Sequence, residues 1–125
     1  MRVLVADDEM NVRSALRLLL EQEPDITVTG EVASYKELST RVKETSPDLI
    51  LLDWELPGGG ETEFFTSLQQ VLPAARVVVL SSRPEIRKMA LSCGATAFVS
   101  KEEPPERLLT VIRKLNFQSE HKSER

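Results

Sequence analysis

Short apolar runs recur along the chain at a spacing that suits strands alternating with helices. Three of these runs hold four consecutive apolar residues, a pattern typical of parallel strands buried on both faces. A fourth run is shorter, and residues 26–32 alternate apolar with polar positions, as a half-exposed edge strand does. The continuous runs are residues 3–6, 49–52, 77–80 and 97–99.

The intervening segments predict helices. Residues 11–22 and 61–72 carry apolar side chains on one face, and a proline follows shortly after each segment. In the first of these helices Arg13 and Arg17 are expected to fall off the apolar face.

Residues typical of helix ends predict three further helices. Ser34, with Glu37 three residues later, forms a capping box for one helix. Pro84 suits the first turn of another, and Gly94 suits the cap at its C-terminal end. The last helix follows Pro105, and one apolar stripe along it comprises Leu108, Leu109, Ile112 and Leu115.

Five strands alternating with five helices predict an α/β, doubly wound domain with a five-stranded parallel, flavodoxin-like sheet. If the alternating segment is an edge and the first strand is central, the strand order is 2-1-3-4-5. Ligands of such sheets bind at the carboxyl ends of the strands where the order reverses, here between strands 1 and 3. We expect one domain over residues 1–117, with residues 118–125 as a polar tail or the start of a linker.

The composition excludes several classes of function. Of 125 residues, 41% are hydrophobic and 29% charged, as in ordinary soluble domains. A net charge of −4 without a basic run argues against binding nucleic acid or an anionic membrane through bulk charge. No apolar stretch approaches the ~18 residues that span a bilayer, and the N-terminus does not resemble a signal peptide. One cysteine excludes an intramolecular disulfide and fits a reducing, cytoplasmic location.

Histidine chemistry is largely excluded, because the only histidine is His121 in the polar C-terminal stretch. A Ser-His-Asp or Cys-His arrangement therefore has no credible base, and a histidine-rich zinc site is absent. Any chemistry must use carboxylates, hydroxyls and amines.

Such groups follow the predicted strands directly. Asp7 and Asp8 follow the first strand, Asp53 the third, Ser81 the fourth and Lys101 the fifth. Any one of these positions alone is more often a plain strand end than a functional residue. Together, however, they converge on one edge of the sheet, and this coincidence favours a functional site.

The chemistry of this set points to phosphoryl groups. Clustered carboxylates repel one another, and a hard cation such as Mg²⁺ relieves the repulsion while leaving positions for phosphate oxygens. A lysine adds positive charge, a serine hydroxyl can donate to an oxyanion, and a carboxylate can be the nucleophile that forms an aspartyl phosphate.

The sequence resembles the receiver domain of two-component response regulators, including the type that precedes a helix-turn-helix output domain. The resemblance covers about residues 2–116 and rests on four segments in order: residues 3–9, 47–58, 77–84 and 94–101. It implies a switch that takes a phosphoryl group from a phosphohistidine on a sensor histidine kinase, uses Mg²⁺, and later loses the group by hydrolysis. Such a domain is not a turnover enzyme on a separate substrate.

The resemblance also implies residue roles. Asp53 is the phospho-acceptor, and Mg²⁺ is held by Asp7, Asp8 and Asp53 with the backbone carbonyl of Glu55. Lys101 pairs with the phosphoryl oxygens.

Further implied roles concern the response to phosphorylation. Ser81 moves to the phosphoryl group, Phe98 turns inward as the aromatic switch residue, and Glu55 and Arg83 tune the phosphoryl lifetime. The surface of the fourth helix, fifth strand and fifth helix then changes. A phosphorylation-dependent homodimer is a further candidate partner, and direct nucleic-acid binding by this domain is not expected.

Two departures from the family pattern matter. Glu102 replaces the proline that often follows the lysine, so we expect a trans bond or a rearranged loop there, since a cis bond before a non-proline residue costs about 3 kcal/mol. Glu61 stands where a glycine is usual, and Gly60 comes one position early, which predicts a shortened or shifted, flexible loop over residues 57–61.

Trp54 is expected to be a partly exposed neighbour of the site whose fluorescence reports metal binding.

Three other function classes stay in competition. A flavodoxin-like cofactor binder needs a glycine- and hydroxyl-rich loop after the first strand, where this chain has Asp7, Asp8 and Glu9. A pseudo-receiver, an interaction module that is not phosphorylated, is disfavoured by the complete acid, hydroxyl and lysine set. A stand-alone phosphatase would need an Asp-x-Asp pair, and residue 9 is glutamate.

Overall fold

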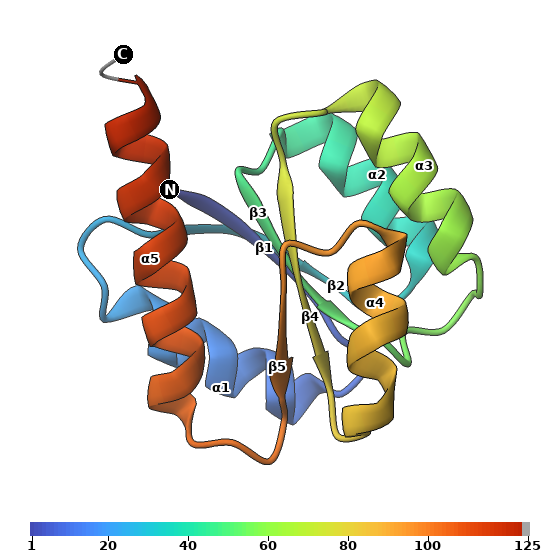
Figure 1. The fold of residues 1–125 in the computed structure, drawn as a ribbon, viewed down its shortest axis with the longest axis horizontal. Coiled ribbons are helices and arrows are strands. Elements are labelled where there is room, and N and C mark those ends of the chain that lie inside the picture. Colours follow the sequence, from blue (N-terminus) through green and yellow to red (C-terminus); the bar gives the residue numbers. More distant parts are fainter. Residues whose placement is uncertain (124–125) are drawn as a thin grey trace.

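One parallel sheet lies between two helical layers in the computed structural model, which describes residues 1–123. Helices α1 and α5 cover one face, and α2, α3 and α4 cover the other (Figure 1). The elements are β1 (Arg2–Ala6), α1 (Met10–Glu21), β2 (Thr27–Val32), α2 (Tyr35–Thr45), β3 (Leu49–Asp53), α3 (Glu61–Val71), β4 (Arg76–Ser81), η1 (Pro84–Ile86), α4 (Arg87–Cys93), β5 (Ala97–Ser100) and α5 (Pro105–Ser123).

The strand order is β2-β1-β3-β4-β5, and every neighbouring pair is parallel. The predicted fold class and order are confirmed. In the register of β1 and β3, Ala6 lies opposite Leu52. Asp7, directly after β1, and Asp53, the last residue of β3, therefore lie side by side where the strand order reverses.

The core has two halves because successive side chains of a strand point to opposite faces of the sheet. Val5 and Leu51 pack toward α1 and α5, whereas Leu4 and Ile50 pack toward α2, α3 and α4. All four are fully buried, as the apolar runs predicted. The stripe on α5 is buried too, so the expected packing of this helix is confirmed for Leu108, Leu109, Ile112 and Leu115.

The edge strand β2 is half-exposed and carries an irregularity in its pairing with β1, where Val3 pairs with Val28 but Leu4 pairs with Gly30. Glu31 on this strand forms ion pairs with Arg13 at 3.4 Å and with Arg17 at 2.6 Å. Both arginines of α1 therefore contact the polar edge of the sheet, a partnership that the apolar pattern of this helix does not indicate.

The helix ends largely follow the terminal residues. Ser34 caps α2, since its Oγ accepts from the Glu37 N–H at 3.2 Å. Pro84 starts a short 3₁₀ turn, and the α-helical hydrogen bonding begins only at Arg87.

The helix α5 continues to Ser123, past the expected domain boundary at residue 117. No glycine or proline occurs between Leu115 and Ser123 to stop it. That residues 118–125 form a tail or the start of a linker stays a prediction, and residues 124–125 lie outside the described residues.

All described peptide bonds are trans, which confirms the expected trans bond between Lys101 and Glu102. Within residues 1–123, none of the helices combines the length and the apolar character needed to cross a membrane.

Tyr35 is an anomaly in this core. Its ring packs against Phe64 with centroids 5.8 Å apart, and its hydroxyl is buried without a hydrogen-bond partner among the described residues. Burial raises the pKa of Tyr35, and the charges of Glu61 and Asp53 add to the rise. A buried hydroxyl without a partner costs stability because it has lost its bonds to water.

Replacing Tyr35 by phenylalanine should therefore raise the free energy of unfolding, by about 1 kcal/mol, because the ring stays and the unsatisfied group leaves. Urea unfolding of the two proteins measures the difference. Tyr35→Leu is the control and should lower the stability, since it also removes the ring contact with Phe64. A loss of stability in Tyr35→Phe would mean that the hydroxyl has a partner in solution.

Candidate functional site

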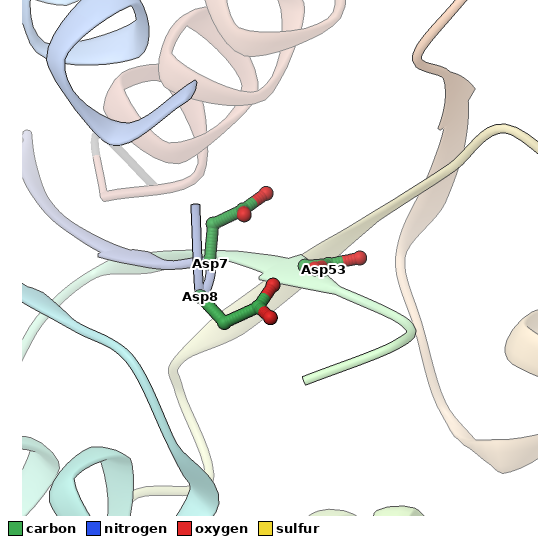
Figure 2. A group of neighbouring side chains, drawn as sticks. All are labelled: Asp7, Asp8 and Asp53. Carbon is green, nitrogen blue, oxygen red and sulfur yellow. The ribbon is translucent and has the colours of Figure 1, made fainter. Parts of the chain in front are cut away.

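Three carboxylates gather at the carboxyl edge of the sheet, where β1 and β3 end (Figure 2). One oxygen from each of Asp7, Asp8 and Asp53 lies within 4.8 Å of the others. Asp7 and Asp53 are only 1% and 2% exposed, whereas Asp8 is open to solvent. The adjacent positions of β1 and β3 in the sheet cause this clustering of like charges.

Lys101 reaches into the cluster from the end of β5. Its Nζ lies 3.0 Å from Oδ2 of Asp7 and 3.2 Å from Oδ1 of Asp53. Its backbone N–H donates to the carbonyl of Ser81 on the neighbouring strand β4, which fixes where the side chain starts. One ammonium against three carboxylates leaves the cluster negative, so it can accept a further cation.

Backbone groups orient the two buried carboxylates. The Glu9 N–H donates to Oδ1 of Asp7 at 2.9 Å, and the Glu55 N–H donates to Oδ1 of Asp53 at 3.1 Å. In both cases the chain turns directly after the aspartate and presents its N–H to the side chain, a common turn for this residue type. Each aspartate is thereby held in place before any ligand arrives.

The burial and the charges of the cluster change the pKa of Asp53. Burial raises the pKa of this carboxyl to about 6, and the charge of Asp7 adds to the rise. The Glu55 N–H and Lys101 oppose it. For Lys101, burial lowers the pKa, but the bonds and charges of Asp7 and Asp53 outweigh burial and raise it overall.

The other sequence-predicted residues lie on the β4 side of the site. Ser81 is fully buried, and its Oγ donates to Oε1 of Glu55 at 3.3 Å. The Arg83 N–H donates to the same Oγ at 3.1 Å, and Nε of Arg83 donates to Oε1 of Glu55 at 2.9 Å. The structure therefore joins Ser81, Glu55 and Arg83 in one network, which the sequence did not indicate beyond placing them near the site.

The two aromatic residues singled out from the sequence are both buried. Phe98 on β5 belongs to the core that contains Ile86 and Ala90. Trp54 is 7% exposed and joins the same core, so its expected partial exposure is wrong. Its backbone N–H donates to the carbonyl of Leu80 on β4 at 2.9 Å, so the bonding between the two segments continues for one residue past the end of β3.

The loop between β3 and α3 has a run of three glycines in left-handed backbone conformations, with φ of 105° at Gly58, 61° at Gly59 and 86° at Gly60. Other residues adopt such angles only at a cost. The Tyr35 N–H donates to the carbonyl of Pro57 at 3.0 Å, which ties the start of the loop to α2. The flexibility expected of residues 57–61 stays a prediction.

An open groove of about 830 Å³ lies at the opposite edge of the sheet. Its lining includes Met1, Asp48, Ala75 and Thr96, near the starts of the strands or just before them, and none of the site residues described above. The groove and the carboxylate cluster therefore lie at opposite edges of the sheet.

Comparison with known proteins identifies the family. Residues 3–113 match the response regulator receiver domain. The chain belongs to this family. The four sequence segments that carried the resemblance all lie within the matched residues or at their edge.

Individual relatives agree with this assignment. The chain is 31% identical over 114 residues to the uncharacterized transcriptional regulatory protein YxjL of Bacillus subtilis (strain 168), covering 90% of this chain and 52% of YxjL. It is 33% identical over 112 residues to the nitrate/nitrite response regulator protein NarL of Escherichia coli (strain K12), covering 88% and 52%. The receiver domain thus spans about half the length of these curated relatives.

A solved structure matches as well. A two-component response regulator of the LuxR family from Aurantimonas sp. SI85-9A1 superimposes with a TM-score of 0.83 at 30% identity, covering 91% of this chain and 83% of that one.

The raised pKa of Asp53 predicts how the stability of the fold depends on pH. Because the folded pKa of Asp53 is raised, the folded protein binds more protons than the unfolded chain between about pH 4 and pH 6, and stability falls as the pH rises through this window. Asp53→Asn should remove the penalty. Without divalent ions we expect the variant to be more stable than the wild type above pH 6, by about 3 kcal/mol, and equally stable below pH 4.

Urea unfolding across this pH range in the presence of a chelator measures the effect. Asp25→Asn is the matched control, since Asp25 is exposed and lies outside the cluster. An equal gain at all pH values would show that the raised pKa is not the cause.

Proposed function

We propose that this receiver domain is a phosphorylation switch in which Asp53 accepts a phosphoryl group from the phosphohistidine of a sensor histidine kinase. The observation that carries the proposal is the position of Lys101 Nζ, 3.0 Å from Asp7 and 3.2 Å from Asp53, beside the exposed carboxylate of Asp8. This arrangement supports roles for Asp53 as the nucleophile, Lys101 as the positive charge and Asp8 as an accessible metal ligand.

The donor set fits Mg²⁺, which prefers oxygen ligands and keeps several waters. Asp7, Asp8 and Asp53 can supply carboxylate oxygens, and the backbone carbonyl of Glu55 is the proposed protein carbonyl ligand. A bound Mg²⁺ would supply the positive charge that the cluster lacks and neutralise phosphoryl oxygens during transfer.

The transfer itself uses few protein groups. An oxygen of Asp53 attacks the phosphorus, the P–N bond to the donor imidazole breaks, and its electron pair stays on the imidazole nitrogen. Lys101, which contacts the carboxylates of both Asp7 and Asp53 in this structure, then pairs with the phosphoryl oxygens. Attack of water on the phosphorus later releases inorganic phosphate and restores Asp53.

The response to phosphorylation involves the β4 side of the site. The Ser81 hydroxyl donates to a phosphoryl oxygen, and the repacking around Phe98 alters the surface of α4, β5 and α5, which a second copy of the domain would recognise. Glu55 and Arg83, which are bonded to Ser81 and to each other, tune the phosphoryl lifetime. Two packings of one core, biased by a charge at one end, suffice for such a switch.

The acceptor assignment predicts the outcome of a phosphorylation assay. Incubation with Mg²⁺ and acetyl phosphate should add the mass of one phosphoryl group to the wild type, and this addition should be lost in Asp53→Asn and on chelation of the metal. Intact-protein mass spectrometry at neutral pH measures it.

The neighbouring acid provides the comparison. Asp8→Asn keeps the acceptor but removes a metal ligand, so it should require more Mg²⁺ for the same extent of modification. If the wild type and Asp53→Asn are modified alike, or if neither is modified, the proposed function is wrong.

A further inference from the structure

The hydroxyl of Ser81 is already engaged. It accepts from the Arg83 N–H at 3.1 Å and donates to Oε1 of Glu55 at 3.3 Å. The residue is fully buried at the end of β4, and its backbone carbonyl accepts from the Lys101 N–H. The position of this side chain is therefore set by hydrogen bonds from both sides.

Glu55 is in turn anchored by Arg83. The Arg83 Nε donates to the same Oε1 that receives the Ser81 proton, at 2.9 Å. The two charged side chains are about half exposed, so their ion pair adds little to the stability of the fold. Its consequence lies in placing a carboxylate oxygen over the hydroxyl of Ser81.

A hydroxyl has one proton to donate. In the proposed function this proton goes to a phosphoryl oxygen on Asp53, and in the structure it goes to Glu55. Both acceptors are anionic oxygens, and one proton cannot be donated to both at once. The two hydrogen bonds are therefore mutually exclusive.

We propose that Ser81, Glu55 and Arg83 form a latch, in which Glu55 occupies the switch hydroxyl and must release it before the phosphorylated arrangement forms. This inference rests on the proposed function and adds the group that opposes it. Glu55 is a positioning residue, acting through Ser81, and Arg83 holds Glu55 in place.

A simpler effect must be separated from the latch. The negative charge of Glu55 also repels an incoming anion, and removing it would help binding without any role for Ser81. The two effects differ in one respect, since only the latch requires the Ser81 hydroxyl. A double-mutant cycle between positions 55 and 81 isolates that requirement.

The experiment measures the affinity for beryllofluoride, a phosphoryl mimic, at saturating Mg²⁺ from the emission of Trp54, the only tryptophan. Glu55→Ala should bind roughly threefold to tenfold more tightly than the wild type, because the competing acceptor is gone. In the Ser81→Ala background the same substitution should give no gain.

Glu102→Ala is the matched control. It removes one negative charge at the same edge of the sheet, next to Lys101, and its side chain has no partner among the described residues. Its affinity should stay near that of the wild type. An equal gain from Glu55→Ala with and without Ser81, or no gain at all, overturns the latch.

The latch is also measurable without metal or beryllofluoride. In ¹⁵N NMR spectra, Glu55→Ala should shift both the Nε–H of Arg83 and its backbone amide, because the Ser81 hydroxyl that accepts from this amide loses its own acceptor. A shift confined to Nε–H overturns the latch. An absent beryllofluoride response in the wild type counts against the proposed function, and the NMR result then decides the latch separately.

Discussion

Two buried carboxylates, a third at the surface and a single ammonium share one end of a parallel sheet, and the chemistry of the domain depends on this imbalance of charge. Asp7 and Asp53 are almost fully buried, and Lys101 contacts both. Burial favours the neutral form of a carboxylate, and the neighbouring acid reinforces this preference. The site is therefore costly to keep ionised, and a divalent cation or a cationic partner removes that cost.

The fold accounts for the imbalance. Parallel strands end at the same edge, and the reversal of strand order places β1 directly beside β3. Apolar residues fill both faces of these strands, so the polar groups that follow them have no place except this edge. At this edge Asp8 is exposed, whereas Asp7 and Asp53 are buried.

The sequence predicted the sheet and the acid cluster because both depend on local pattern. Continuous apolar runs mark buried strands, and the residue after each run marks the strand end, so the pattern alone places Asp53 and Lys101 at one edge. The family resemblance added roles to these positions, and the match over residues 3–113 confirms the family.

Other features depend on tertiary partners that no local pattern encodes. The apolar periodicity of α1 does not predict a contact between Arg13 and the sheet. The contact exists because Glu31 on the edge strand forms an ion pair with Arg13. The expected partial exposure of Trp54 is wrong because its ring packs with residues of distant segments in the core, and its backbone N–H bonds to Leu80 on β4. The contacts among Ser81, Glu55 and Arg83 join three segments whose side-chain directions are fixed only after the sheet has formed.

The origin of Lys101 has a consequence for dynamics. This lysine extends from β5, an outer strand that pairs with β4 alone, whereas the carboxylates it neutralises extend from inner strands. An outer strand has one hydrogen-bonded neighbour instead of two, so fewer backbone bonds oppose its local opening. Any such opening would withdraw the ammonium and leave Asp7 and Asp53 facing each other unshielded. The local opening of β5 and the ionisation of Asp7 and Asp53 are thus thermodynamically linked. A cation bound to these acids would therefore also lower the free-energy cost of opening β5.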